Sequence, residues 1–98
     1  MDILSSRILL RPSDLDRSRR FYRDALGLAI YREFGPPDNS GVVFFAGSGF
    51  LEVSGHAAGP AGRSVVIWIQ VRDVRAEHAL LATAGVPVIR APAAEPWD

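Results

Sequence analysis

The sequence predicts an α+β domain in which a strand–helix–strand unit occurs twice. Each helical segment begins with an aspartate, Asp14 or Asp73, and ends at a glycine, Gly27 or Gly85, after almost the same number of residues. An aspartate at the N-cap accepts hydrogen bonds from the free N–H groups of the first turn, and glycine readily adopts the left-handed conformation that ends a helix. Strand-like segments flank both helices, so we expect mixed sheets with helices on their outer faces.

The first unit reads as a β-α-β-β-β module. Its helix has apolar residues near helical spacing, and its strands are short, apolar and bounded by turn residues. A Gly-Pro-Pro-Asp-Asn loop follows the second strand, and Gly-Ser-Gly separates the last two. We expect strands at 7–11, 28–34, 41–46 and 50–54 and a helix at 13–28.

The second unit is shorter and is expected to be an incomplete copy of the module. Residues 64–71, SVVIWIQV, form the strongest strand candidate in the chain, followed by a helix at 74–84 and a short strand at 86–89. Strand alternation would place Trp68 and Gln70 on a cleft face, with Ile67 and Ile69 packed against helices. The predicted organisation is module one at 1–55, a linker at 56–63 and a partial module two at 64–98.

Composition excludes several classes of function. The chain has 98 residues, its 11 basic and 11 acidic residues cancel, and it has no cysteine. A balanced charge favours neither nucleic acid nor an anionic membrane as a partner, and the lack of cysteine excludes disulfides and thiolate chemistry. We find no apolar run of membrane-spanning length and no signal-peptide pattern, so we expect a cytoplasmic protein.

Short motifs along nearly the whole chain resemble the vicinal oxygen chelate superfamily, which includes glyoxalases, extradiol dioxygenases and bleomycin-resistance proteins. The resemblance implies two β-α-β-β-β modules whose curved sheets enclose a cleft for a small ligand, often across a dimer. The chain departs from the pattern because its second module lacks the last hairpin. The motifs are SDLDRS at 13–18, FYRD at 21–24, LGL at 26–28, FLEV at 50–53, VRDV at 71–74, AGV at 84–86 and EPW at 95–97.

Enzymes of this superfamily hold a divalent ion, and the resemblance places three of its ligands at Arg7, Glu52 and Val66. Arginine has no acceptor atom and valine has no heteroatom, so only Glu52 is chemically able to bind a cation. A catalytic ion usually needs about three protein ligands. We therefore expect no metal and no cofactor, with Glu52 as the only candidate catalytic residue.

The expected ligand-binding residues lie on the cleft faces of the predicted strands. Arg7 could bind a carboxylate or phosphate of a ligand, or it could form a salt bridge with Glu52. The aromatic residues could form cleft walls or simply fill the core, and His56 and His78 are expected to be ordinary histidines. The candidate ligand-binding residues are Arg7, Arg11, Phe45, Phe50, Glu52, Trp68 and Gln70.

These features leave three classes of function open. The first is a metal-independent small-molecule binding protein of the bleomycin-resistance type, with an aromatic or cationic ligand. The second is a divalent-metal-dependent lyase, isomerase or dioxygenase, and the third is a noncatalytic dimerisation domain. In each case we expect a homodimer, because the 64–71 strand would expose an open apolar edge to another chain.

Overall fold

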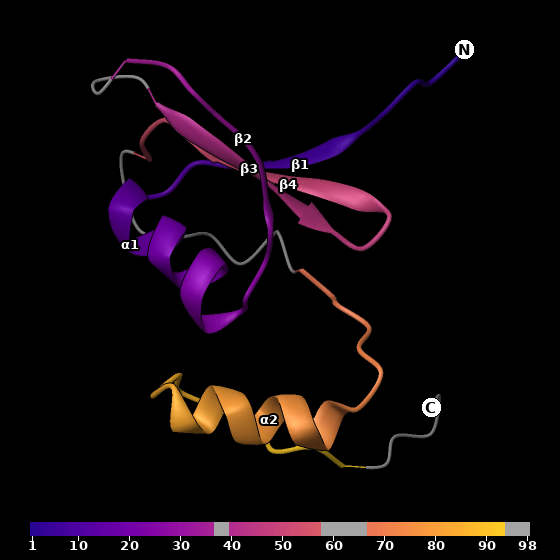
Figure 1. Cartoon of the computed structure of the whole chain (residues 1–98), viewed down its shortest axis with the longest axis vertical. Helices are drawn as coiled ribbons and strands as arrows, with labels where there is room; N and C mark the ends of the chain where they lie inside the picture. Colours follow the sequence, from indigo (N-terminus) through magenta and orange to yellow (C-terminus); the bar gives the residue numbers. More distant parts are fainter. Residues whose placement is uncertain (37–39, 58–66, 94–98) are drawn as a thin grey trace. The chain divides into compact units, whose positions relative to one another are not determined.

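The computed structural model describes residues 1–36, 40–57 and 67–93 (Figure 1). The chain divides into two compact units, Met1–Ser64 and Val65–Asp98. The first unit contains every strand found among the described residues, and the second contains one helix. The α+β class predicted from the sequence is confirmed, with one full β-α-β-β-β module.

The first unit is built on a four-stranded mixed sheet with the order β1-β4-β3-β2. Strand β1 pairs parallel with β4, while β2 with β3 and β3 with β4 are antiparallel. The four predicted strands are therefore confirmed, with ends that differ by at most two residues. Their bounds are Arg7–Leu10 for β1, Ile30–Phe34 for β2, Gly41–Ala46 for β3 and Gly49–Ser54 for β4.

The helix of the first unit changes its winding part-way along. It begins as α1 (Leu15–Arg20) and continues as the π-helical segment η1 (Phe21–Ala25). The N-cap Asp14 accepts a hydrogen bond from the Arg17 backbone N–H at 3.1 Å, as the sequence predicts. Gly27 follows the helix with φ of +68°. The wide π turn was not predicted, because it depends on how the helix packs rather than on capping residues.

The hydrophobic core lies between this helix and one face of the sheet. Val42, Phe44 and Val53 are almost fully buried there. The ring of Tyr22, from η1, lies 5.9 Å from that of Phe44. On the edge strand β1, Ile8 shares this face with its register partner Leu51 but stays half exposed. The other residues packed against the core are Leu15, Leu28 and Ile30.

The second unit contains α2 (Val74–Thr83), which confirms the second predicted helix. Asp73 accepts from the Ala76 backbone N–H at 3.0 Å, and Gly85 follows with φ of +80°. The predicted strands at 64–71 and 86–89 are wrong in their described parts, because residues 67–71 and 86–89 form no strand. A strand is stabilised by a hydrogen-bonded neighbour, and no strand among the described residues of this unit offers one. Residues 64–66 lie outside the described part of the chain.

Candidate ligand-binding face

The sheet face turned away from α1 carries most of the predicted site residues, and we call it the far face. Successive residues of a strand point to opposite faces of the sheet. In β3 and β4, the residues that alternate with the core residues therefore point to the far face. The register aligns Arg7 of β1 with Phe50 of β4 and with Phe45 of β3. The next row places Glu52 between Leu9 and Val43.

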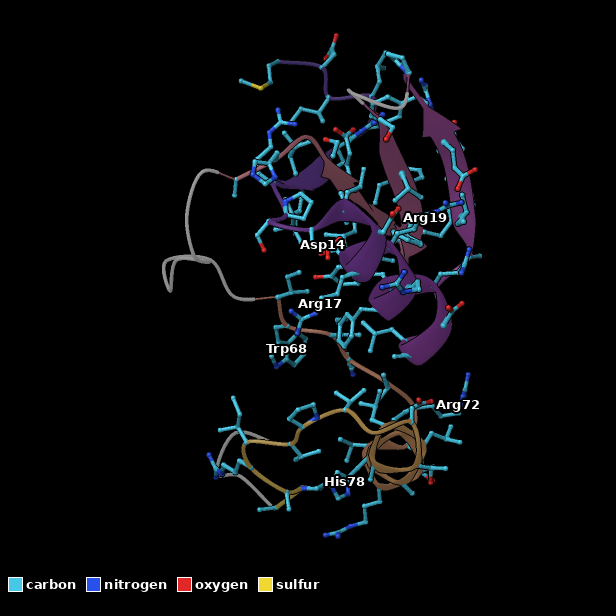
Figure 2. The ribbon with its side chains drawn as sticks, turned by 90° about the vertical axis from the view of Figure 1, so that its left-hand side faces the viewer. Asp14, Arg17, Arg19, Trp68, Arg72 and His78 are labelled. Atoms are coloured by element: carbon cyan, nitrogen blue, oxygen red, sulfur yellow. The ribbon has the colours of Figure 1, made fainter. Side chains whose placement is uncertain are left out.

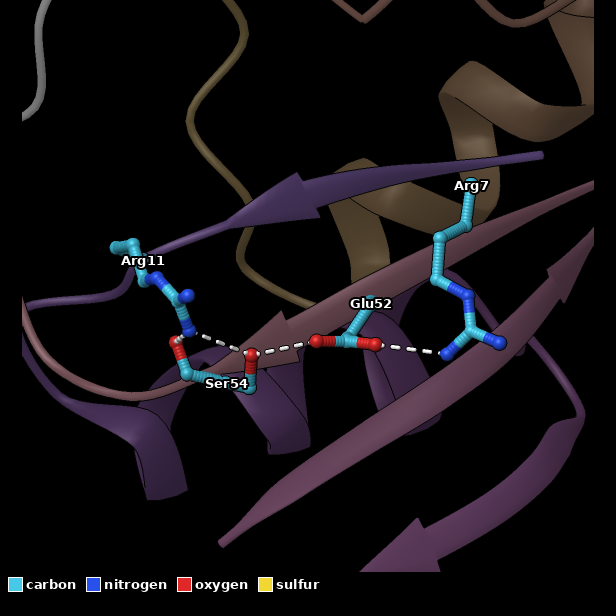
Figure 3. A network of polar contacts seen from close by, with 4 residues as sticks. All are labelled: Arg7, Arg11, Glu52 and Ser54. Atoms are coloured by element: carbon cyan, nitrogen blue, oxygen red, sulfur yellow. Dashed lines mark hydrogen bonds and ion pairs between the residues drawn. The ribbon is translucent and has the colours of Figure 1, made fainter. Parts of the chain in front are cut away.

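A chain of hydrogen bonds joins four polar residues on this face (Figure 3). Arg7 Nη1 donates to Glu52 Oε1 at 2.8 Å, and Ser54 Oγ donates to Glu52 Oε2 at 2.8 Å. Arg11 Nη1 donates in turn to Ser54 Oγ at 3.0 Å and to the Ser54 carbonyl at 3.3 Å. The salt-bridge interpretation of Arg7 is therefore confirmed. Ser54 was missed, although strand alternation places it on the same face as Glu52.

The environment of Glu52 keeps its carboxylate ionised. Burial raises the pKa of this carboxyl, but the hydrogen bonds from Ser54 and Arg7 and the positive charges of Arg7 and Arg11 outweigh burial, so its pKa lies below the usual value. A carboxylate held by two donors is a weak proton acceptor at neutral pH. Glu52 therefore fits a structural and electrostatic role better than that of a general base.

The donor set of the far face does not fit a divalent ion. Both carboxylate oxygens of Glu52 already accept hydrogen bonds, and one of the donors is the cation of Arg7. Across the described ranges, no three His, Cys, Asp or Glu side chains group as a metal site requires. Val66, the third aligned position, lies outside the described residues. The expected lack of a cofactor stays a prediction.

Three aromatic rings gather at the hairpin end of the far face. The ring centroid of Tyr31 lies 5.1 Å from that of Phe45 and 5.0 Å from that of Phe50, and the two phenylalanine rings are 5.6 Å apart. Tyr31 is 50% exposed and Phe45 is 43% exposed, so this cluster is a surface and not the core. The sequence analysis missed Tyr31, which alternation from the core residue Ile30 could have placed here.

The remaining ligand-binding candidates, Trp68 and Gln70, lie in the second unit. Trp68 is 77% exposed and Ile69 is 49% exposed, in a stretch without strand pairing (Figure 2). The two-residue alternation proposed for 64–71 therefore has no strand to support it in residues 67–71. Trp68 and Gln70 as cleft-lining residues stay a prediction. His78 lies on α2 and His56 follows β4, and neither belongs to the hydrogen-bond chain.

In the described part of the chain, hollows of two sizes lie beside the helix of the first unit. The larger, of about 450 Å³, lies between α1 and the ends of β2 and β3, and it includes Arg19 and Glu33, which form an ion pair. The smaller, of about 250 Å³, lies along α1 and η1 and includes Asp14 and Arg17 (Figure 2). Neither is lined by the polar chain or the aromatic cluster of the far face.

Comparison with known proteins establishes the family. The model of the Glyoxalase/Bleomycin resistance protein/Dioxygenase superfamily matches residues 5–98. The chain belongs to this superfamily. No curated protein sequence matches the chain. In the described part of the chain, no helix has both the length and the apolar character that crossing a bilayer requires.

Solved structures agree with the family model. The trypanothione-dependent glyoxalase I of Leishmania major is similar at 25% identity and a TM-score of 0.73, over 89% of this chain and 70% of that protein. The lactoylglutathione lyase of Agrobacterium tumefaciens is similar in fold at 21% identity and a TM-score of 0.58, over 86% of this chain and 71% of that protein. Both likenesses support the superfamily fold.

Proposed function

We propose that this chain binds a small organic molecule on the far face without a metal ion. The observation that carries the proposal is that Glu52 is held by Arg7 and Ser54 next to an exposed aromatic cluster. The arginines on this face supply donors for an anionic or polar group, and the rings supply a flat apolar surface. Metal-independent binding, as in the bleomycin-resistance branch, needs only these two elements.

The similarity to glyoxalase I favours a second candidate, a metal-dependent lyase. A metal-dependent lyase would need Glu52 to give up a hydrogen bond in order to bind the metal. It would also need at least two further protein ligands. Arg7 at the aligned ligand position opposes this, because a guanidinium repels a cation and offers no lone pair. The similarity to known structures favours the lyase, whereas the donor set of the far face favours metal-independent binding, and our proposal follows the donor set.

Elemental analysis and a ligand panel separate the two functions. The purified chain is analysed for Zn, Ni, Mn and Fe, and its thermal unfolding is followed with anionic, neutral and cationic aromatic compounds. Binding predicts a raised Tm with at least one class and no stoichiometric metal. Stoichiometric metal that Glu52→Ala removes would establish the metal site and overturn the proposal. A panel that leaves the Tm unchanged would also contradict it.

Two further expectations belong to this proposal. A homodimer is supported by the sheet order, which leaves β1 and β2 at the two edges of the described sheet. An open strand edge at 64–71 does not support the dimer, because residues 67–71 form no strand. A cytoplasmic location is also a proposal, based on the composition alone.

A further inference from the structure

We propose that the far face selects an aromatic carboxylate, with the aryl ring on the aromatic cluster and the carboxylate on Arg7. This inference rests on the proposed binding function and narrows it to one chemical class. It departs from the sequence-based expectation, which allowed a cationic ligand.

The positions of the two binding elements follow from the register of the sheet. Arg7 and Phe50 are direct partners on β1 and β4, and Phe50 is the partner of Phe45 on β3. Tyr31 of β2 touches both phenylalanine rings. The register therefore aligns the Arg7 guanidinium with two phenylalanine rings across β1, β4 and β3. Tyr31 lies at the irregularity of β2 between Ile30 and Arg32, and its ring adds a third by contact. Adjacent strands lie about 4.8 Å apart, so the backbones of Arg7 and of Phe50, which carries the first ring, are separated by one strand spacing.

Arg7 keeps donors for a ligand after it has paired with Glu52. The salt bridge uses Nη1, and Nε and Nη2 donate to no other atom in the described part of the chain. The side chain is 39% exposed, while that of Glu52 is only 12% exposed. A guanidinium fork matches a carboxylate geometrically. Glu52 thus holds the guanidinium from the buried side, and the free donors remain accessible to an incoming anion.

The charge on this face favours an anion over a cation. Arg7 and Arg11 carry two positive charges and Glu52 carries one negative charge, which leaves a net charge of +1 for the hydrogen-bonded chain. Arg32, the register partner of Val43, adds another arginine to this side of the sheet. Glu52 already accepts from Arg7 and Ser54 and is only 12% exposed, so a ligand ammonium group would have to compete with Arg7 for a largely buried carboxylate.

The aromatic cluster has the geometry of a stacking surface. The Tyr31 and Phe45 rings meet edge to face at 81°, and the other two pairs are tilted at 53° and 41°. Aromatic pairs prefer such offset and edge-to-face arrangements, and a ligand ring can extend the same pattern. Because Tyr31 and Phe45 are about half exposed, a ligand would bury aromatic surface that now faces water.

Four matched compounds test the inference by calorimetric titration of the full chain. They are phenylacetate, its neutral analogue phenylacetamide, the cation phenethylamine and the non-aromatic anion cyclohexylacetate. We expect phenylacetate to bind best, with phenylacetamide about tenfold weaker because it lacks charge-assisted hydrogen bonds. We expect cyclohexylacetate to bind about fivefold more weakly, because its saturated ring has no π system to pair with the aromatic cluster.

Variants of Arg7 and Phe45 test which side chain produces each of these ligand preferences. Arg7→Gln should remove the preference for phenylacetate over phenylacetamide, while Arg17→Gln, on exposed α1, should keep it. Phe45→Leu should remove the preference for phenylacetate over cyclohexylacetate. If Arg7→Gln does not fold by circular dichroism, Arg7→Lys takes its place, and it should weaken phenylacetate binding while keeping the charge.

The outcomes separate this inference from the proposed function. Equal affinity for phenylacetate and phenylacetamide, or a preference for phenethylamine, would overturn the carboxylate assignment and leave small-molecule binding intact. Retained selectivity in Arg7→Gln would overturn the role of Arg7. If none of the four compounds binds while another member of the wider panel does, the aromatic carboxylate is wrong and the binding function stands.

Discussion

Replacing Glu52 by glutamine tests the centre of the hydrogen-bond chain on the far face. The variant keeps the shape of the side chain but removes the negative charge that pairs with Arg7. One amide oxygen can accept from either Ser54 or Arg7, while the amide N–H groups would face the remaining donor. We expect the free energy of unfolding to fall by about 1–2 kcal/mol, less than for a fully buried pair because Arg7 is partly exposed.

The lowered pKa of Glu52 determines how the stability lost in Glu52→Gln depends on pH. Because the folded state lowers the pKa of Glu52 below its usual value, its stabilising contribution is fully present above the unfolded-state pKa and is lost as the pH falls through the folded-state pKa. The difference in stability between wild type and Glu52→Gln should therefore be largest at neutral pH and shrink in acid.

Urea unfolding followed by circular dichroism at pH 7 and at pH 3 measures the effect. Asp2→Asn is the matched control, because Asp2 is exposed near the chain start, and its unfolding should match that of wild type at pH 7. A Glu52→Gln variant as stable as wild type at pH 7, or a stability difference independent of pH, would refute the electrostatic role of Glu52.

Three further predictions concern the first unit and its assembly. Asp14→Ala should lower the free energy of unfolding by about 1 kcal/mol in urea titrations, since it removes the N-cap acceptor of α1, and an unchanged midpoint would contradict this role. Gly41→Ala should cost about 1–3 kcal/mol in the same assay, because its Cβ would lie 2.5 Å from Phe34 Cζ and 2.6 Å from Ser54 Cβ, whereas Gly49→Ala has room and should cost less. Light scattering at micromolar concentration should show a homodimer, and a well-folded, monodisperse monomer would disprove it.

The helices and the first module could be predicted because their signals are local. Asp14 and Asp73 cap their helices through atoms three residues away, so the sequence contains all that the contact needs. Alternation along the first strand placed Arg7 on the cleft face, and the family resemblance placed Glu52 in the same cleft, where the two form an ion pair. Contacts and orientations that depend only on residues close in sequence can be predicted from the sequence.

Other features were decided by tertiary structure, because they depend on residues far apart in the chain. Residues 64–71 have the strongest strand composition, yet their described part, 67–71, forms no strand, since β structure requires a hydrogen-bonded partner that composition cannot supply. The row from Arg7 through Phe50 to Phe45 exists only because the register of two strand pairs aligns three strands. Ser54 completes the environment of Glu52, and its hydroxyl also accepts a hydrogen bond from Arg11, which lies 43 residues away in the sequence. The sequence determined the elements and their faces, and the register between strands decided which side chains meet.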